Sequence, residues 1–164
     1  MRRASIAACA LPAALACTVA AAQSTARPDI TGTWLVEDGD ARVAVAPCDE
    51  SACGTIVWLR EPYADNGDEK LDIHNRDERL RGRRVMGLEI FRAAKPVGSK
   101  DEMWRGTVYD PEIGRTYTCK AELREDGRLL EIRGFVGLSL FGRTTDWTRV
   151  AAAPRHEPER IELE

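Results

Sequence analysis

The segment Arg115-Thr116-Tyr117-Thr118-Cys119-Lys120-Ala121-Glu122-Leu123 alternates between polar and less polar side chains along its whole length. Successive side chains of an extended strand point to opposite faces, so this period of two predicts a strand with one dry face. The segment 129–136 alternates in the same way, as in the strands of an antiparallel sheet with one wet face. The predicted inward residues of the two segments are Tyr117, Cys119, Ala121, Leu123, Leu130, Ile132, Gly134 and Val136.

Six further β-type runs accompany this pair, separated by turn residues. The segment 110–114 (Asp-Pro-Glu-Ile-Gly) is typical of a tight turn, because proline suits its first corner and glycine its left-handed end. Asp126-Gly127 indicates a two-residue hairpin. About eight short antiparallel strands must fold over into a sandwich or close into a barrel. The predicted strands cover residues 31–37, 42–46, 54–60, 86–92, 103–109, 115–123, 129–136 and 144–150.

Gly32, with Trp34 two positions later, opens the first predicted strand. Gly-x-Trp at this place resembles the lipocalin and wider calycin pattern, in which the tryptophan closes one end of the barrel. An arginine from the last strand packs across it there, and Arg143 and Arg149, on either side of Trp147, are the candidates. An arginine can stack on an indole while its head stays hydrogen-bonded. The resemblance implies an all-β fold, an antiparallel lipocalin-like (calycin-like) β-barrel of about eight strands with one long charged loop.

Further motifs follow one another along residues 31–150 and resemble an uncharacterised secreted bacterial family, domain of unknown function 2147. The resemblance implies a lipocalin-like fold and no established enzymatic activity, so it informs the fold more than the function. Arg76 and Arg84 stand where that family often has proline, and Cys119 lies outside its pattern. The motifs are Cys53-Gly54-Thr55-Ile56-Val57-Trp58, Asp72-Ile73-His74-Asn75, Leu80-Arg81-Gly82-Arg83 with Gly87-Leu88, Gly106-Thr107-Val108-Tyr109-Asp110-Pro111-Glu112, Thr116-Tyr117, and Gly142-Arg143-Thr144 with Trp147-Thr148-Arg149.

The start of the chain is typical of a secretory signal peptide, with Arg2 and Arg3 before an alanine-rich apolar stretch and a small-residue cleavage site before Gln23. A periplasmic or secreted location is therefore expected. A membrane anchor is the alternative, although the apolar run is marginal for spanning a bilayer, and a lipoprotein attached through Cys17 is another. The predicted segments are a signal peptide at 1–22, a polar leader at 23–30, the barrel domain at 31–150 and a disordered tail at 151–164.

The composition excludes several classes of partner. With 24 basic and 27 acidic residues the net charge is −3, so no basic excess points to nucleic acid or to an anionic membrane surface. An apolar content of 43% is enough for a packed core and too little for a membrane protein. No transmembrane segment is expected after signal cleavage, and no cofactor motif is present.

Three cysteines remain after the predicted cleavage. Cys48 and Cys53 flank four residues at the ends of a hairpin, and a disulfide is expected in an oxidising compartment. A metal-binding thiol pair is the alternative, but it needs further ligands that neither histidine supplies nearby. Cys119 is expected to be a small buried core residue, and a reactive thiol in the barrel is the alternative.

The segment 61–84 is densely charged and holds no apolar run. Asn75 and Glu78 resemble a capping box for a short helix over 76–82, and Asp72 and Asn75 are interpreted as backbone caps rather than catalysts. The acids of the loop could hold calcium, but their spacing does not match a calcium loop, so pairing with neighbouring arginines is preferred and no metal site is predicted.

The leading hypothesis for function is a carrier of a small apolar molecule inside the barrel, because closed barrels of about eight strands can hold one ligand. The alternative is a non-catalytic structural or protein-interaction module of the cell envelope with a filled barrel. An enzyme comes third, since no catalytic set is visible. The tentative barrel lining is Tyr117, Cys119, Ala121, Leu130, Ile132 and Val136.

Overall fold

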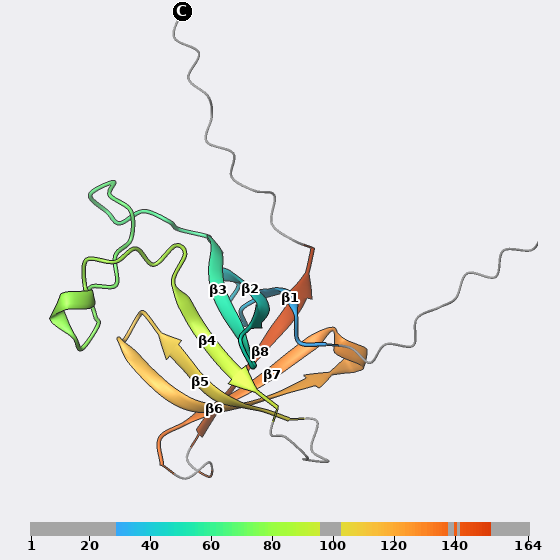
Figure 1. Cartoon of the computed structure of the whole chain (residues 1–164). Helices are drawn as coiled ribbons and strands as arrows, with labels where there is room; N and C mark the ends of the chain where they lie inside the picture. The colour runs from blue at the N-terminus through green and yellow to red at the C-terminus, as the bar shows by residue number, and fades with distance from the viewer. Residues whose placement is uncertain (1–28, 96–102, 138–139, 141, 152–164) are drawn as a thin grey trace, which may run out of the picture.

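A computed structural model of the protein describes residues 29–95, 103–137, 140 and 142–151, and its eight strands form a closed barrel (Figure 1). Two short 3-10 helices, η1 (Glu78–Leu80) and η2 (Glu125–Gly127), lie in the connections. The strands are β1 (Gly32–Leu35), β2 (Ala41–Cys48), β3 (Ser51–Leu59), β4 (Glu89–Ala94), β5 (Trp104–Asp110), β6 (Arg115–Arg124), β7 (Leu129–Phe135) and β8 (Gly142–Val150).

Every strand pairs antiparallel with the next one along the chain, and β8 returns to pair with β1. This meander confirms the predicted all-β barrel, and each of the eight predicted segments overlaps one strand. Because the chain reverses at every connection, successive connections lie at alternate ends of the barrel, so the loop after β3 and the turn after β5 share one end (Figure 1). Within the described part of the chain, no helix has the length and apolar character that crossing a membrane requires.

The barrel interior is filled by large side chains. Trp34, Leu130 and Ile132 are completely buried, and the rings of Phe91 and Trp147 meet with centroids 6.0 Å apart. Close packing of this kind leaves few voids in a protein interior. The described side chains in the centre of the barrel therefore form a packed apolar core.

The alternation of β6 and β7 holds through most of both strands. Cys119 and Ala121 are buried on β6, and Leu130 and Ile132 are buried on β7, as the period of two predicts. The expectation for Val136 is wrong in one respect: β7 ends at Phe135, and the Val136 side chain is 69% exposed. An inward direction follows from alternation only while the backbone stays extended.

The two predicted turns have different outcomes. Gly114 adopts the left-handed conformation with φ 64°, and Asp110 accepts a hydrogen bond from the Glu112 amide, so the turn at 110–114 is as expected. The two-residue hairpin at 126–127 is wrong, because β6 ends at Arg124 and η2 lies in the longer connection.

The predicted boundaries fall partly outside the described residues. The signal peptide at 1–22, most of the leader at 23–30 and all but the first residue of the tail at 151–164 lie outside them. Ile30, which was expected in a polar leader, is 1% exposed and belongs to the core cluster. The folded domain therefore begins before the predicted residue 31.

Candidate functional site

One end of the barrel, where β1 begins and β8 ends, is sealed by an arginine on a tryptophan. The Arg149 guanidinium lies 4.2 Å from the centre of the Trp34 ring, and β1 and β8 pair these two residues in register. Trp34 donates a hydrogen bond from its indole nitrogen to the Ile30 carbonyl oxygen at 2.9 Å. Of the two candidate arginines, Arg149 is the correct one, since Arg143 is exposed near the start of β8. We call this the closed end.

The Arg149 head group ties three chain segments together. It donates hydrogen bonds of 2.6 Å each to the carbonyl oxygens of Asp29, Thr31 and Gly127. Burial lowers the pKa of Arg149, because the charged form loses hydration. Position 32 favours glycine for two reasons. Its φ of 132° is rare for residues with a side chain, and a Cβ there would collide with the Arg149 head group.

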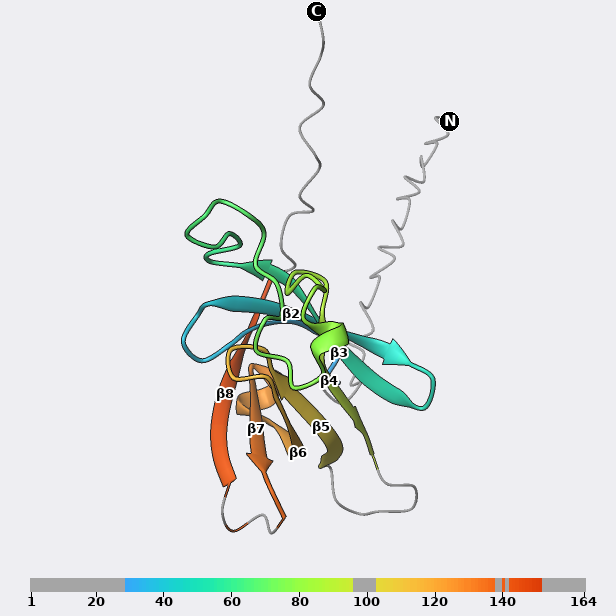
Figure 2. The same cartoon turned by 90° about the vertical axis from the view of Figure 1, so that its left-hand side faces the viewer.

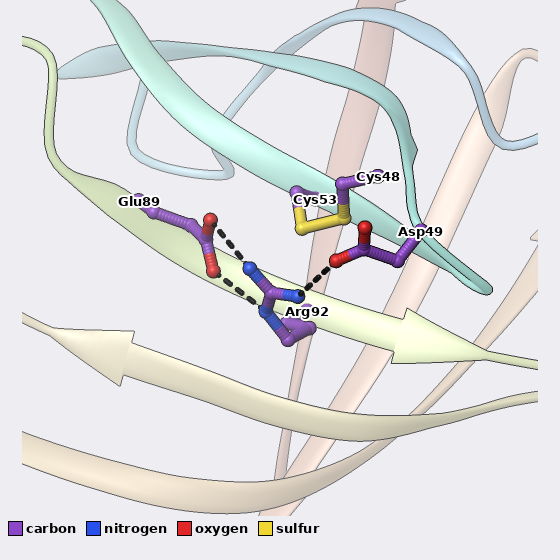
Figure 3. Close-up of a disulfide and its surroundings, with 5 residues drawn as sticks. All are labelled: Cys48, Asp49, Cys53, Glu89 and Arg92. Atoms are coloured by element: carbon purple, nitrogen blue, oxygen red, sulfur yellow. Dashed lines mark hydrogen bonds and ion pairs between the residues drawn. A yellow bond between two sulfur atoms is a disulfide. The ribbon is translucent and has the colours of Figure 1, made fainter.

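The hairpin between β2 and β3 is cross-linked at the closed end. Cys48 and Cys53 form the expected disulfide, with Cα atoms 5.7 Å apart. Figure 3 shows Arg92 beside it, held by Glu89 through hydrogen bonds of 2.9 and 3.0 Å and lying 4.0 Å from the Asp49 carboxylate. The thiols are consumed by the disulfide, so the alternative of a metal-binding pair is excluded for them in this state.

The opposite end, which we call the open end, carries the charged loop between β3 and β4 (Figure 2). Its helical part is shorter than predicted, because only η1 forms. The cap is also different: Asp77, not Asn75, caps η1 by accepting a hydrogen bond from the Arg79 amide at 3.1 Å. The Arg79 side chain donates to the same carboxylate, which lowers the pKa of Asp77.

Asp72 is the anchor of this loop. Its side chain is completely buried and accepts hydrogen bonds from the Tyr109 hydroxyl at 2.6 Å, Asn75 Nδ2 at 2.8 Å and Arg83 Nε at 2.8 Å. The interpretation of Asp72 as a backbone cap is therefore wrong, since its carboxylate joins the loop to β5 through side chains. A buried carboxylate persists in a protein only with such partners.

Asn75 satisfies several polar groups of the same cluster. Its amide nitrogen donates to Asp72 and, at 2.9 Å, to the Tyr109 oxygen, while its side-chain oxygen accepts from the Asp77 backbone amide at 2.9 Å. Its carbonyl oxygen accepts from Arg81 Nε at 2.8 Å. The expectation of a capping role holds for Asn75 in part, because one of these bonds goes to a backbone amide.

The Asp72–Tyr109 pair lacks the properties of an acid–base pair poised for neutral pH. Burial raises the pKa of Tyr109, and the hydrogen bond to Asp72 and its negative charge raise it further. The phenol therefore stays protonated. The Arg83 guanidinium lies 5.5 Å from the centre of the Tyr109 ring and neutralises the Asp72 charge. This arrangement positions the loop on the barrel.

A cavity of about 740 Å³ lies at the open end. Phe91 and Tyr117 reach it from the core-facing row of β4 and β6, whereas Arg92 and Thr107, which pair in register, reach it from the outer row. The cavity therefore crosses the rim of the barrel wall above the filled core. Its walls come from residues 75–83 of the loop, β4, β5, the turn at 114, the start of β6 and the residue after β7, and comprise Asn75, Arg76, Asp77, Leu80, Arg83, Glu89, Ile90, Phe91, Arg92, Thr107, Tyr109, Gly114, Arg115, Thr116, Tyr117 and Val136.

The predicted barrel lining divides into two groups. Tyr117 and Val136 line the cavity, Val136 from its exposed edge. Four others do not line it, because they are packed in the core: Cys119, Ala121, Leu130 and Ile132.

Cys119 is the buried, unpaired thiol that the alternation predicts. Desolvation raises its pKa to about 12, so the thiolate needed for nucleophilic chemistry is absent at neutral pH. Among the described residues, no group of three or more histidine, cysteine or acidic side chains could hold a metal ion. Several loop acids instead pair with arginines, for example Glu69 with Arg84 at 2.8 Å and Glu78 with Arg81 at 3.2 Å.

An eight-stranded antiparallel barrel with an arginine across a tryptophan at its closed end is the architecture of a lipocalin-like protein. A solved structure of a protein from the human pathogen Helicobacter pylori, described as belonging to the lipocalin family, is similar to this fold. The two share 19% sequence identity with a TM-score of 0.61, over 76% of this chain and 84% of that one. This likeness extends to the fold alone.

The chain belongs to the DUF2147 family, described as uncharacterized proteins conserved in bacteria, whose family model matches residues 32–149. The resemblance drawn from the motifs is thereby confirmed. No curated protein matches the chain significantly.

Sequence reasoning missed the partners of Asp72 and the charged cavity wall. Tyr109 and Arg83 lie within motifs already quoted, but Tyr109 is 37 positions from Asp72 in the chain. Arg76 and Arg115 lie next to the points where the loop between β3 and β4 touches the turn between β5 and β6. No period or spacing reveals such contacts, because they depend on how the loop folds back over β5.

Proposed function

We propose that this protein is a periplasmic or secreted carrier of a small, largely apolar molecule, which it holds in the cavity at the open end. One observation supports this most: a cavity of about 740 Å³ lies above a solid core, within the range of small-molecule sites. We place the ligand at the rim of the barrel, whereas the alternation of 115–123 and 129–136 predicts it in the barrel centre.

The shape of the molecule favours binding at this end. The closed end is tied by the Arg149 bonds and the disulfide, whereas the open end is bordered by a long loop attached through the buried Asp72. Sites of this kind are commonly formed by loops positioned on a rigid scaffold. Apolar side chains at the cavity edge, among them Leu80 and Val136, are exposed and would be covered by a ligand.

A second candidate, a non-catalytic interaction module of the cell envelope, is supported by the filled core. Leu130 and Ile132 are completely buried and leave the barrel centre solid. The charged loop would then face a protein partner. The two candidates differ in whether a small molecule occupies the cavity, and this can be measured.

The first test is native mass spectrometry of the mature protein purified from the periplasm, followed by solvent extraction. Carriage predicts an added mass that leaves on denaturation. A titration with the neutral fluorescent probe N-phenylnaphthylamine complements this, and we expect one probe molecule to bind per chain.

A matched pair of variants locates the probe. Thr116 lines the cavity and Thr118, two positions along the same strand, does not, while both are exposed. We expect Thr116→Trp to fill the cavity and weaken probe binding about tenfold or more, and Thr118→Trp to leave it unchanged. A bare mass together with no probe binding would contradict carriage and favour the interaction module.

A further inference from the structure

The charged loop and the turn between β5 and β6 touch through their backbones at the cavity edge. A Cβ atom at Gly114 would overlap the His74 carbonyl oxygen and come close to the Asn75 nitrogen, so these segments are in direct contact. Arg76 and Arg115 follow immediately after the two touching points, and both line the cavity. Two arginines distant in sequence therefore start from neighbouring backbone positions on one wall.

Two other arginines of the cavity are already neutralised. Arg83 donates to the buried Asp72 carboxylate at 2.8 Å. Arg92 is held by Glu89, with hydrogen bonds of 2.9 and 3.0 Å. Neither of these guanidinium groups needs a further anion.

The remaining charges of the cavity are unbalanced. Asp77 also lines it, but its carboxylate is taken by Arg79 at 2.7 Å. Arg76 and Arg115 are exposed and make no ion pair with any residue in the described ranges. Asp110, which faces Arg115 in register, accepts the Glu112 amide instead and does not line the cavity. The wall therefore presents two uncompensated positive charges.

An apolar surface continues from these charges. Phe91 and Tyr117 form the inner part of the cavity, and Leu80 and Val136 border it with exposed side chains, 40% and 69% accessible. Exposed apolar side chains gathered beside charged ones are typical of a surface that binds an amphipathic partner.

We propose that the cavity takes a soluble anionic amphiphile, a single molecule with an acidic head and an apolar tail, and that Arg76 and Arg115 hold the head. Guanidinium groups bind carboxylate, sulfonate and phosphate oxygens through paired hydrogen bonds. This inference deepens the proposed function and rests on it, since it names the chemical class of the carried molecule. A free monomer and the headgroup of a membrane lipid share this chemistry, and the structure favours the monomer because the arginines lie in a cavity with an apolar floor.

Decanoate and decanol test the acidic head directly, because they share one tail length and differ in charge. Each is titrated as a displacer of bound N-phenylnaphthylamine, below its aggregation concentration. We expect decanoate to bind about tenfold more tightly than decanol. The difference should shrink as salt screens the charges.

The arginine pair is tested by Arg76→Gln combined with Arg115→Gln. The preference for decanoate should fall to near unity while decanol binding stays unchanged. The control, Arg124→Gln combined with Arg128→Gln, removes the same charge from exposed arginines outside the cavity, and the preference should persist. Both double variants should keep the wild-type circular dichroism spectrum, and single variants replace either double that does not fold.

The possible outcomes distinguish a failure of the anionic inference from a failure of the proposed carrier function. If N-phenylnaphthylamine binds but decanoate and decanol displace it equally, the cavity carries neutral molecules and the anionic inference is wrong. If the preference survives loss of both arginines, it is also wrong. If vesicles of anionic phospholipid bind the protein and decanoate does not, the source is a membrane surface and the monomer is excluded. If the probe does not bind and native mass spectrometry shows a bare mass, the proposed carrier function fails first.

Discussion

The two ends of this barrel each place an arginine on an aromatic ring, but they bind the arginine differently. At the closed end Arg149 lies 4.2 Å from the Trp34 ring and donates to three backbone carbonyl oxygens. At the open end Arg83 lies 5.5 Å from the Tyr109 ring and is bound to the buried Asp72 carboxylate.

The two arginines have different roles, because Arg149 closes one end of the barrel and Arg83 helps to position the loop at the other. Carbonyl oxygens belong to the backbone, so the Arg149 bonds join the chain before β1 directly to η2 and β8, with Trp34 filling the space beneath. The Asp72 cluster is made by side chains and attaches a loop beside a cavity of about 740 Å³. Stability is therefore expected to depend more on the closed end, and binding more on the open end.

The largest effect is expected from Trp34→Ala at the closed end. Removing a completely buried indole should lower the free energy of unfolding by about 4 kcal/mol. Urea unfolding followed by circular dichroism measures this. Trp58→Ala is the control, because Trp58 is only half-buried and the Arg42 guanidinium lies 4.9 Å from the centre of its ring. This variant should lower the free energy of unfolding by about 1 kcal/mol. Equal losses for the two variants would contradict the special role of the closed end.

Arg149→Gln should rank second. The carbonyl oxygens of Asp29, Thr31 and Gly127 lose charged donors, and the expected loss is about 3 kcal/mol. Arg143→Gln, an exposed change on the same strand, should cost less than about 0.5 kcal/mol. Comparable urea midpoints for the two variants would show that the sealing bonds contribute nothing.

Asp72→Ala tests the open end. Tyr109 and Arg83 would lose their shared acceptor, and we expect a loss of about 2–3 kcal/mol, less than for a fully buried pair because Arg83 is partly exposed. This variant should also bind N-phenylnaphthylamine more weakly, since Arg83, Asn75 and Tyr109 line the cavity. Asp65→Ala, an exposed change in the same loop, should alter neither quantity. Unchanged probe binding in Asp72→Ala would contradict the role of Asp72 in positioning the loop beside the cavity.

Loss of the disulfide should cost about 2 kcal/mol, because the Cys48–Cys53 loop is short and constrains the unfolded chain only modestly. Replacing both cysteines by alanine and measuring urea unfolding gives this value, and reduced wild-type protein should match it. Affinity for N-phenylnaphthylamine should not change, since neither cysteine lines the cavity. A weakened probe affinity would show that the two ends are coupled.

The smallest effect concerns Cys119, which lies in the core between the two ends. Burial raises the pKa of its thiol from 9.0 to about 12, so the native state holds this proton more tightly than the unfolded chain. The stability that this pKa difference gives the native state is fully present below the unfolded pKa and is lost as the pH rises from there toward 12. At about pH 10 the wild type should lose about 1 kcal/mol more than Cys119→Ala, relative to neutral pH. Parallel pH profiles for the two proteins would contradict this.

Much of the fold could be predicted from local sequence. The alternation at 115–123 identifies the buried Cys119 and Ala121. The sealed end at Trp34 follows from the resemblance of Gly32-x-Trp34 to the lipocalin pattern. Less could be predicted of the candidate site. The period of two predicts Val136 inside the barrel but ends one residue earlier, and the local sequence indicates a backbone cap at Asp72, although its partners include Tyr109, far along the chain.

The sequence alone determined the strands and the disulfide, because each depends on neighbours a few residues apart or on the alternation of an extended chain. The sealing role of Trp34 was implied by the resemblance to lipocalins. Only the tertiary structure decided that the core is filled, that the cavity lies at the rim, and that Arg76 and Arg115 both line it. These features arise where segments distant in sequence come into contact. Side-chain volume and charge balance at such contacts are properties of the folded chain, and no local pattern encodes them.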